Sequence, residues 1–380
     1  MDTLLSDFPW LGSPRNFALI GSSVAGTLAL VALTRYAFHS TPPKIIPSPR
    51  ITVLPNLSKE EQNALAYPPD IFPGSRDVVS PYGTFRAYEF GPEQGRKVVL
   101  LHGISTPCVA LGGIATALVE KGCRVILFDL WGRGYSDSVD LPHDSRLYTS
   151  QILLAVTSSP LSWTPEGFSV IGYSLGGGIA ADFAASFPDL VTGLVLLAPG
   201  GLIRSRHFGW QSRLLYSGLL PDSLLERLVR KRLGGTSSNT SSTKQGDAEK
   251  AAQEEIKGNS SQGFDSTPLS KKWPGVTVGR VTDWQLANHE GFVRSFVSSI
   301  KFASLEGAHE RWKKLGALKE KVIIIAGKTD PIIVADELHE DATATVGADN
   351  IEWRVIEGGH EFPISCPDEV VNEIAGVWGI

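Results

Sequence analysis

A serine that stands between two glycines, where an apolar run meets a small-residue helix pattern, constrains this chain most. Residues 168–173 have the length and apolar character of a short buried strand, and residues 175–187 follow with a helical pattern. Gly172 and Gly176 flank Ser174, each two residues away. Glycines there allow a tight strand-to-helix turn that exposes the serine hydroxyl. The pattern predicts a nucleophilic serine; the alternative is a glycine-rich turn that only packs a helix against a sheet.

Strand and helix patterns alternate on both sides of this serine. After a predicted hairpin at 77–90, we expect strands at 97–101, 124–129, 168–173, 194–198, 321–326 and 350–356, and helices at 108–121, 147–156, 175–187, 334–345 and 367–378. Such alternation is typical of a mostly parallel sheet with helices on both faces. The predicted fold class is therefore α/β, and the chemistry of such sheets lies at the carboxyl ends of the strands.

Shifts in composition divide the chain into five segments. They are a hydrophobic N-terminal segment (1–40), a proline-rich linker that we expect to be extended (41–76), the first part of an α/β core (77–199), an inserted helical cap (200–315) and the second part of the core (316–380). Within the cap, residues 234–263 are mostly Gly, Ser, Thr, Gln, Lys and Glu. Because so few of them are apolar, we expect a disordered loop there.

The N-terminal segment contains an uncharged, mainly apolar run at 17–33. A run of this length predicts a single membrane-anchoring helix, with a signal or transit peptide and a buried helix as alternatives. Asp2 and Asp7 argue against a cleaved signal peptide. Arg35, Lys44 and Arg50 follow the run, which favours a cytosolic position for the folded domain.

Charge and cysteine content exclude several classes of partner and site. The net charge is −5, and no basic stripe interleaved with aromatic residues is present, so nucleic-acid binding is not expected. The three cysteines, Cys108, Cys123 and Cys366, are odd in number and lack C-x-x-C spacing. This pattern predicts neither a disulfide framework nor a zinc site.

An acid and a histidine follow two strands of the second core part. Asp330 comes after the apolar run 322–326, and His360 comes after the run 350–356 and two glycines. With Ser174 they give the order Ser, Asp, His along the chain. Three further motifs accompany them: Leu-His-Gly at 101–103, Asp-Leu-Trp-Gly-Arg-Gly-Tyr-Ser at 129–136 and Gly-Gly-His at 358–360. In these motifs the chain resembles the α/β-hydrolase family, in its serine-nucleophile branch.

The resemblance implies a role for each of these residues. Ser174 would be the nucleophile, His360 the general base and Asp330 the acid that orients His360. The backbone N–H groups of Leu175 and Ile104 would form the oxyanion hole, with Ser105 as the second choice for the latter. His102 and Asp129 are expected to hold loops in place rather than to take part in catalysis. The resemblance implies neither a metal nor an organic cofactor.

Residue 174 and the cap limit the range of possible substrates. A serine at this position excludes the activities of relatives that use an aspartate nucleophile to open epoxides or displace halides. The apolar cap and the predicted anchor favour a lipophilic ester, and the chain resembles monoacylglycerol lipases and esterases with an N-terminal membrane anchor. Two alternatives stay open: a thioesterase, lactonase or carbon–carbon hydrolase of a secondary-metabolite pathway, and a non-catalytic binding protein of the same fold. The sequence does not indicate an oligomeric state.

Overall fold

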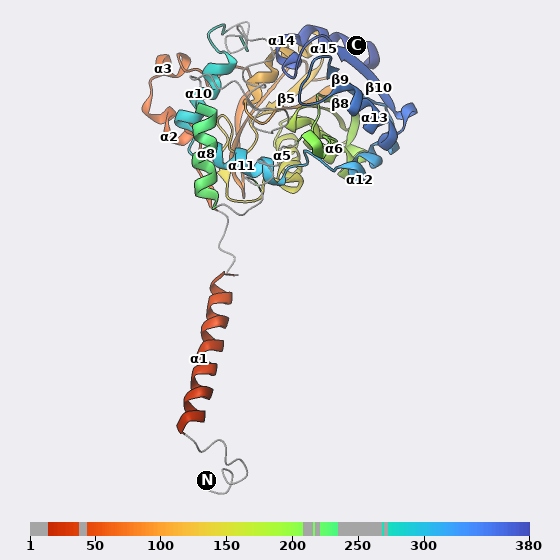
Figure 1. Cartoon of the computed structure of the whole chain (residues 1–380). Helices are drawn as coiled ribbons and strands as arrows, with labels where there is room; N and C mark the ends of the chain where they lie inside the picture. The colour runs from red at the N-terminus through yellow and green to blue at the C-terminus, as the bar shows by residue number, and fades with distance from the viewer. Residues whose placement is uncertain (1–13, 38–43, 208–215, 217–220, 235–267, 270–272) are drawn as a thin grey trace. The chain divides into compact units, whose positions relative to one another are not determined.

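The computed structural model describes residues 14–37, 44–207, 216, 221–234, 268–269 and 273–380 (Figure 1). It divides into two units, Met1–Pro43 and Lys44–Ile380. The first unit contains helix α1 (Pro14–Ala37). The second contains the sheet and the helices that surround it.

The predicted membrane anchor is wrong. Nowhere in the described chain is there a helix with both the length and the apolar character needed to cross a membrane. The uncharged run 17–33 falls short of the about 20 apolar residues that a span requires. Gly21, Ser22, Ser23, Gly26 and Thr27 also interrupt its apolar side chains. The localisation deduced from this anchor, a membrane-tethered domain on the cytosolic side, falls with it.

An eight-stranded sheet forms the centre of the second unit, with the strand order β10-β9-β8-β7-β4-β5-β3-β2. Its strands are β2 (Ser75–Ser80), β3 (Gly83–Phe90), β4 (Lys97–Leu101), β5 (Arg124–Phe128), β7 (Phe168–Tyr173), β8 (Val191–Leu197), β9 (Val322–Gly327) and β10 (Ile351–Ile356). β3 runs antiparallel to β2 and β5, and the other neighbouring pairs are parallel. The predicted α/β class with a mostly parallel sheet is confirmed.

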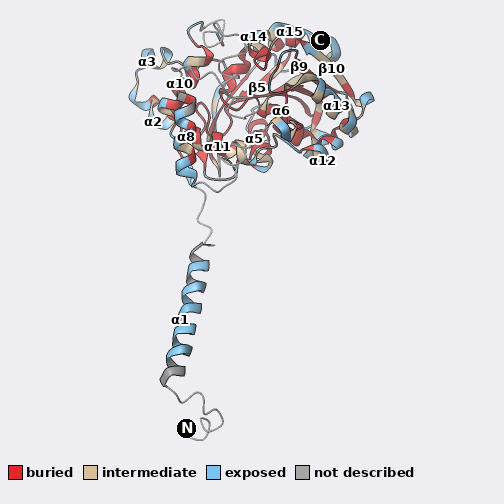
Figure 2. Ribbon diagram, viewed as in Figure 1, coloured by how far each residue is buried: buried red, intermediate tan, exposed pale blue. Residues whose placement is uncertain are grey.

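Helices cover the sheet and bury its strands. The longer ones outside the cap are α4 (Gly112–Glu120), α5 (Ser145–Thr157), α6 (Leu175–Ser186), α13 (Ala335–Val346) and α15 (Pro367–Trp378). α4 packs against α15, whereas α6 contacts α5 and the short helix α12 (His309–Trp312), which in turn contacts α13. β7 and β9 are buried along their whole length because layers on both faces exclude water. Figure 2 shows this burial as red strands inside helices with exposed outer faces.

Besides the short helix α12, three longer described helices of the inserted cap lie between β8 and β9 in the chain. They are α8 (Asp222–Gly234), α10 (Val278–Asn288) and α11 (Phe292–Phe302), and α11 contacts both of the others. Leu225 and Val229 of α8 and Phe292 and Phe296 of α11 are buried. Their apolar faces therefore pack inward. The predicted disordered loop lies, from residue 235 on, outside the described residues, and the cap boundaries at 200 and 315 stay a prediction.

Residues 44–73, which we call the N-terminal strap, differ from the extended linker that the prolines suggested. The strap contains β1 (Ile45–Ile46), α2 (Pro49–Thr52), the 3-10 turn η2 (Leu54–Asn56) and α3 (Lys59–Asn63). β1 pairs antiparallel with β6 (Ser138–Val139). The strap buries Ile46, Ser48, Leu54, Tyr67, Ile71 and Phe72. Apolar side chains at these intervals hold the segment against the core despite its proline content.

Tyr67 joins the strap to the core and to the cap. Its hydroxyl donates a hydrogen bond to the buried carboxylate of Asp129 at 3.1 Å. Its ring stacks on Tyr135, with the centroids 4.9 Å apart, and meets Trp284 of α10 edge-on at 6.0 Å. Aromatic pairs in these geometries stabilise a contact beyond the area that they bury. The strap thus contacts the cap directly, through Tyr67 and Trp284.

Candidate active site

Ser174 occupies the turn between β7 and α6. Its backbone has φ 54° and ψ −117°, a conformation that residues other than glycine rarely adopt. Gly172 packs so closely that a Cβ there would lie 2.1 Å from the carbonyl oxygen of Gly176. The glycines of the motif are therefore required by contact distances. The turn holds Ser174 at the N-terminus of α6.

The structure brings Ser174, His360 and Asp330 together in one hydrogen-bonded chain. His360 Nε2 lies 2.9 Å from Ser174 Oγ, and His360 Nδ1 lies 2.8 Å from Asp330 Oδ2. A carboxylate only accepts hydrogen bonds, so Nδ1 carries the proton and Nε2 is left to accept from the serine hydroxyl. Asp330 Oδ1 accepts from the N–H groups of Ile332 at 2.8 Å and Ile333 at 2.9 Å. These backbone bonds fix the carboxylate, whose side chain is fully buried.

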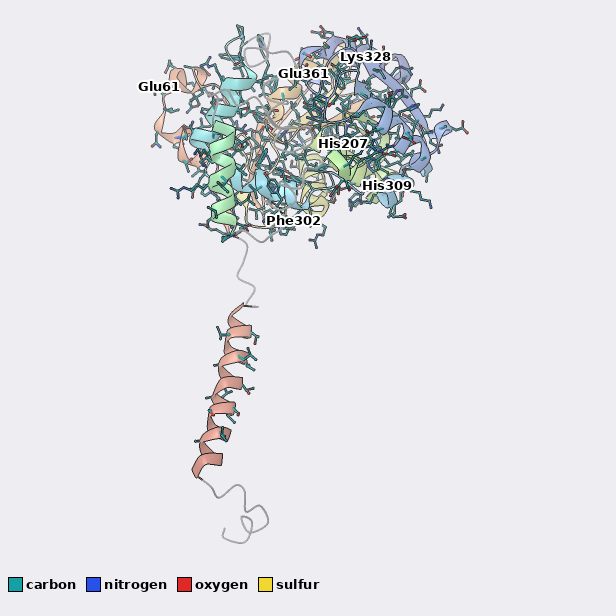
Figure 3. The ribbon with its side chains drawn as sticks, viewed as in Figure 1. Glu61, His207, Phe302, His309, Lys328 and Glu361 are labelled. Atoms are coloured by element: carbon teal, nitrogen blue, oxygen red, sulfur yellow. The ribbon has the colours of Figure 1, made fainter. Side chains whose placement is uncertain are left out.

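Both hydrogen-bond partners of Ser174's chain, His360 and Asp330, stand directly after strands. Asp330 follows β9 and His360 follows β10, and β9 and β10 are neighbouring parallel strands. In the described part of the chain, His360 is the histidine that bonds Ser174; His207 pairs instead with Glu337 at 2.7 Å, and His309 belongs to α12 (Figure 3). The order of the strands therefore places Asp330 and His360 at the edge of the sheet where β7 ends.

His102 holds the loop that follows β4. Its Nδ1–H donates to the carbonyl oxygen of Gly103 at 2.8 Å, and its Nε2 accepts from the N–H of Leu130 at 2.9 Å. Burial, assisted by the nearby charge of Arg133, lowers the pKa of His102 to about 3. The ring is thus neutral, with both nitrogens engaged in bonds to backbone groups. This is the loop-holding position expected from the sequence.

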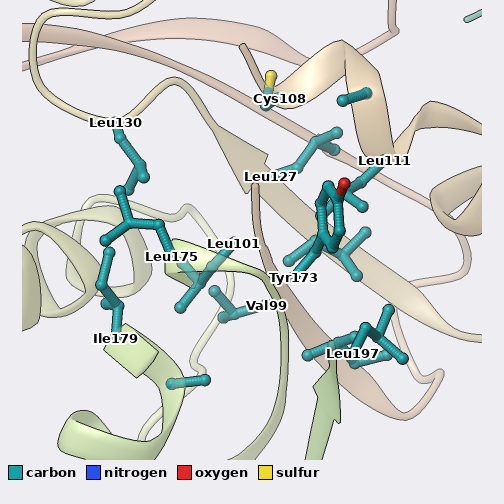
Figure 4. Packing of buried hydrophobic residues seen from close by; sticks show 14 of the residues in the cluster. Val99, Leu101, Cys108, Leu111, Leu127, Leu130, Tyr173, Leu175, Ile179 and Leu197 are labelled. Carbon is teal, nitrogen blue, oxygen red and sulfur yellow. The ribbon is translucent and has the colours of Figure 1, made fainter. Parts of the chain in front are cut away.

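The two predicted oxyanion donors lie on adjoining segments. Leu175 begins α6 directly after Ser174, and Ile104 lies in the loop after β4. A Cβ at Gly176 would lie 2.2 Å from the carbonyl oxygen of Leu101, so the serine turn and this loop are in close contact. Figure 4 shows Leu175 gathered with Leu101 and Leu130 in the buried core. The use of the Leu175 and Ile104 N–H groups as donors stays a proposal.

Asp129 organises the turn after β5. Its carboxylate accepts from the N–H groups of Cys108 and Tyr135, both at 2.9 Å, and from the Tyr67 hydroxyl. Burial raises the pKa of Asp129, and these hydrogen bonds oppose that rise. A Cβ at Gly134 would lie 2.2 Å from Asp129 Oδ2, so this glycine lets the turn close over the carboxylate. Asp129 therefore ties the strap, the turn and the segment after the loop at 103–105 together.

Arg133 and Gln285 bond the loop after β4, and the sequence analysis singled out neither side chain. Both side chains are fully buried between the core and the cap. Arg133 belongs to the Gly-Arg-Gly turn, where its charge suggests an exposed position, and Gln285 lies on cap helix α10. A glutamine inside an amphipathic helix gives no signal of its own. Only the docking of the cap reveals these contacts.

Three buried histidines surround Arg133 and are neutral. Burial is the main cause that lowers the pKa of His102 and of His143 to about 3 and that of His289 to about 4, and the charge of Arg133 adds to it. The His289 Nε2–H donates to the carbonyl oxygen of Ser136 at 2.8 Å. Unfolding exposes these rings to water, where an ordinary histidine has a pKa of about 6.5. Acid therefore favours the unfolded state, which binds more protons.

We expect His289→Gln to make the free energy of unfolding fall less steeply towards acid pH. Glutamine can keep a donor for the Ser136 carbonyl but does not titrate. The pKa of His289 is lower in the folded state than in the unfolded state. The stability that neutral His289 contributes is therefore fully present near neutral pH and is lost as the pH falls from about 6.5 towards 4. Between pH 7.5 and 5 the free energy of unfolding of the wild type should drop about 2 kcal/mol more than that of the variant. Urea titrations at both pH values measure this difference. The exposed His309, replaced by glutamine, is the control; equal slopes for wild type and His289→Gln would contradict the expectation.

The family model described as the alpha/beta hydrolase family matches residues 98–373, well over half of the chain. The chain belongs to the α/β-hydrolase family. The matched region contains Ser174, Asp330 and His360, while the N-terminal strap lies before it.

Curated relatives of this α/β-hydrolase match over part of their length. An uncharacterized protein of Mycobacterium tuberculosis is 29% identical over 182 residues, which cover 44% of this chain and 51% of the relative. A serine hydrolase-like protein of Dictyostelium discoideum is 34% identical over 137 residues, covering 33% and 37%. The chain thus spans about half, or less, of the length of the relatives it matches.

Solved structures extend the likeness to most of the chain. An esterase from Thermogutta terrifontis superposes with a TM-score of 0.57 and 18% identity, covering 80% of this α/β-hydrolase and 97% of the esterase. The thioesterase domain from the curacin biosynthetic pathway gives a TM-score of 0.52 and 17% identity over 79% and 98%. At such identities the likeness shows the shared fold.

Proposed function

We propose that this α/β-hydrolase is a serine hydrolase that cleaves esters of lipophilic acyl groups through an acyl-serine intermediate. The observation that carries the proposal is the hydrogen-bonded chain from Ser174 Oγ through His360 to Asp330, with distances of 2.9 Å and 2.8 Å. A serine hydroxyl is a weak nucleophile until a neighbouring base accepts its proton. Here an oriented, unprotonated imidazole nitrogen stands within hydrogen-bond distance of it.

The acylation step follows from this arrangement. Ser174 Oγ attacks the ester carbonyl carbon while His360 Nε2 takes the hydroxyl proton, and the Asp330 carboxylate stabilises the resulting imidazolium. The carbonyl oxygen becomes an oxyanion, which the N–H groups of Leu175 and Ile104 would bind near the N-terminus of α6. When the intermediate collapses, the carbon–oxygen bond of the ester breaks and His360 returns the proton to the leaving alcohol.

Deacylation uses the same residues, with water as the nucleophile and Ser174 as the leaving group. His360 Nε2 removes a proton from water, whose oxygen attacks the acyl carbon. The second oxyanion occupies the same position, and its collapse releases the carboxylic acid and returns the proton to Ser174 Oγ. The chain's own groups complete this cycle.

The apolar composition of the cap favours a lipophilic substrate over a polar one. Val278, Val281 and Trp284 of α10 and Phe292 and Phe296 of α11 are buried apolar residues of the cap. The solved structures of similar fold include esterases and a thioesterase domain, so the screening substrates should include both ester and thioester bonds.

Labelling by a fluorophosphonate probe tests the proposal on the full chain. We expect the wild type to be labelled, and Ser174→Ala and His360→Ala to lose labelling by at least about 10³-fold, because nucleophile and base act as a unit. Ser186→Ala, at the far end of α6, is the matched control and should label like the wild type. Labelled protein is then screened with p-nitrophenyl esters and matching thioesters of increasing chain length. A wild type that is folded by circular dichroism yet stays unlabelled would exclude the hydrolase and favour a binding protein.

A further inference from the structure

Two buried side chains, one from the Gly-Arg-Gly turn and one from the cap, hold the backbone of the loop at 103–105. Arg133 Nε donates to the carbonyl oxygen of Ile104 at 3.2 Å, and Gln285 Nε2 donates to that of Ser105 at 3.0 Å. Neither side chain is exposed to solvent. Together with the His102 bond to the preceding carbonyl, three successive carbonyl groups of the loop are fixed by side chains.

Both of these residues connect the loop to the cap. Gln285 belongs to α10, and its Oε1 also accepts from the N–H of Gly134 at 2.9 Å. Arg133 Nη2 donates to Ser299 Oγ on α11 at 2.9 Å. The docked cap therefore bonds to the loop and to the Gly-Arg-Gly turn at the same time.

Holding a carbonyl also directs the N–H of the next residue. A peptide unit is planar and trans, so its C=O and N–H point in opposite directions. The bond from Arg133 to the Ile104 carbonyl thus sets the direction of the Ser105 N–H. The bond from His102 to the Gly103 carbonyl does the same for the Ile104 N–H. The N–H groups of Ile104 and Ser105 are the two candidate oxyanion donors of the loop. The bond from Gln285 to the Ser105 carbonyl fixes the next peptide unit, between Ser105 and Thr106, and so anchors the end of the loop directly after these donors.

We propose that Gln285 is a positioning residue through which the docked cap orients the oxyanion loop, so that full stabilisation of the transition state requires the cap in place. The inference rests on the proposed function, because an oxyanion has to form for the loop to act. Removing one oxyanion donor from a serine hydrolase lowers kcat about 10²- to 10³-fold. If the loop keeps its donors but their alignment is disturbed, kcat should fall by a smaller factor.

The test compares Gln285→Leu with wild type on p-nitrophenyl butyrate and on an alkyl trifluoromethyl ketone, which forms a tetrahedral adduct with the serine. We expect kcat to fall about 10- to 100-fold, the inhibition constant of the ketone to rise by a similar factor, and KM to stay within about twofold. Thr282→Val is the matched control. Thr282 lies on the same helix, is equally buried, and its hydroxyl bonds only the helix carbonyl of Val278 among the contacts described.

Ser299→Ala provides a second variant in case Gln285→Leu fails to fold. It removes the α11 partner of Arg133 and should lower kcat and ketone affinity together by about threefold to tenfold, again at constant KM. Unchanged kcat in the folded variants would overturn the inference. So would a loss that appears in KM alone, or an equal loss in Thr282→Val.

Labelling of the wild type separates this inference from the proposed function. If the fluorophosphonate does not label the wild type, the proposed function fails, and the inference fails with it. If the wild type is labelled and hydrolyses the ester while Gln285→Leu matches it in every constant, only the positioning role is refuted.

Discussion

Asp330→Asn is expected to lower kcat about 10⁴-fold while leaving the fold intact. The asparagine oxygen can keep the bonds that Asp330 Oδ1 accepts from Ile332 and Ile333. Its amide nitrogen would then face His360 Nδ1, where the Asp330 carboxylate now accepts. Two donors cannot share this position, so His360 moves its proton to Nε2 and can no longer accept from Ser174. The variant also lacks the negative charge that stabilises the imidazolium.

Steady-state kinetics with p-nitrophenyl butyrate, together with circular dichroism, measure the effect. Asp336→Asn is the control, because Asp336 is an exposed acid at the start of the next helix, α13. It should retain wild-type kcat. A loss of less than tenfold in folded Asp330→Asn would mean that Asp330 does not orient the base.

A chain that begins at Gly74, without the N-terminal strap, is expected not to fold. Such a chain loses the buried side chains of Ile46, Leu54, Tyr67, Ile71 and Phe72. Each stabilises the fold by about 1.5–3 kcal/mol, so their loss removes on the order of 10 kcal/mol. This is comparable with the whole stability of a typical domain, about 5–15 kcal/mol. The deletion also leaves the carboxylate of Asp129 without the hydroxyl of Tyr67 in the interior.

A chain that begins at Lys44 keeps the strap and is the matched control. Residues 44–380 form one compact unit, so this chain should unfold at the same temperature as the full chain. Thermal unfolding followed by circular dichroism compares the three proteins. A chain from Gly74 that melts cooperatively within a few degrees of the full chain would show that the strap contributes little.

Much of the core could be predicted because its signals are local. An apolar run followed by a glycine-bounded Ser174, or by Asp330 or His360, marks a strand and the residue at its end. Parallel strands then bring these ends to one edge of the sheet, where the three side chains bond. The topology follows from the order of the elements, so proximity could be argued without knowing a single long-range contact.

The strap and the cap contacts were beyond sequence reasoning because they depend on distant partners. Prolines around Tyr67 favour an extended chain locally, and only the pocket formed by Asp129, Tyr135 and Trp284 explains its burial. Gln285 likewise bonds backbone groups about 150 or more residues away. The prediction of a membrane anchor at 17–33 was wrong for another reason: the run is free of charge, but its glycine and serine residues lower its apolar character.

The insertion of the cap between β8 and β9 has a consequence for synthesis of the protein. β8 pairs with β9 along Leu194–Leu197, and the residues between these strands must be translated before β9 emerges from the ribosome. At about 5–20 residues per second this interval lasts on the order of 10 s. During that time the newly formed sheet ends in β8, an apolar strand with unpaired backbone groups, which is a template for aggregation. Slow translation through the cap prolongs that exposure, so the codons of the cap bear on the yield of folded protein.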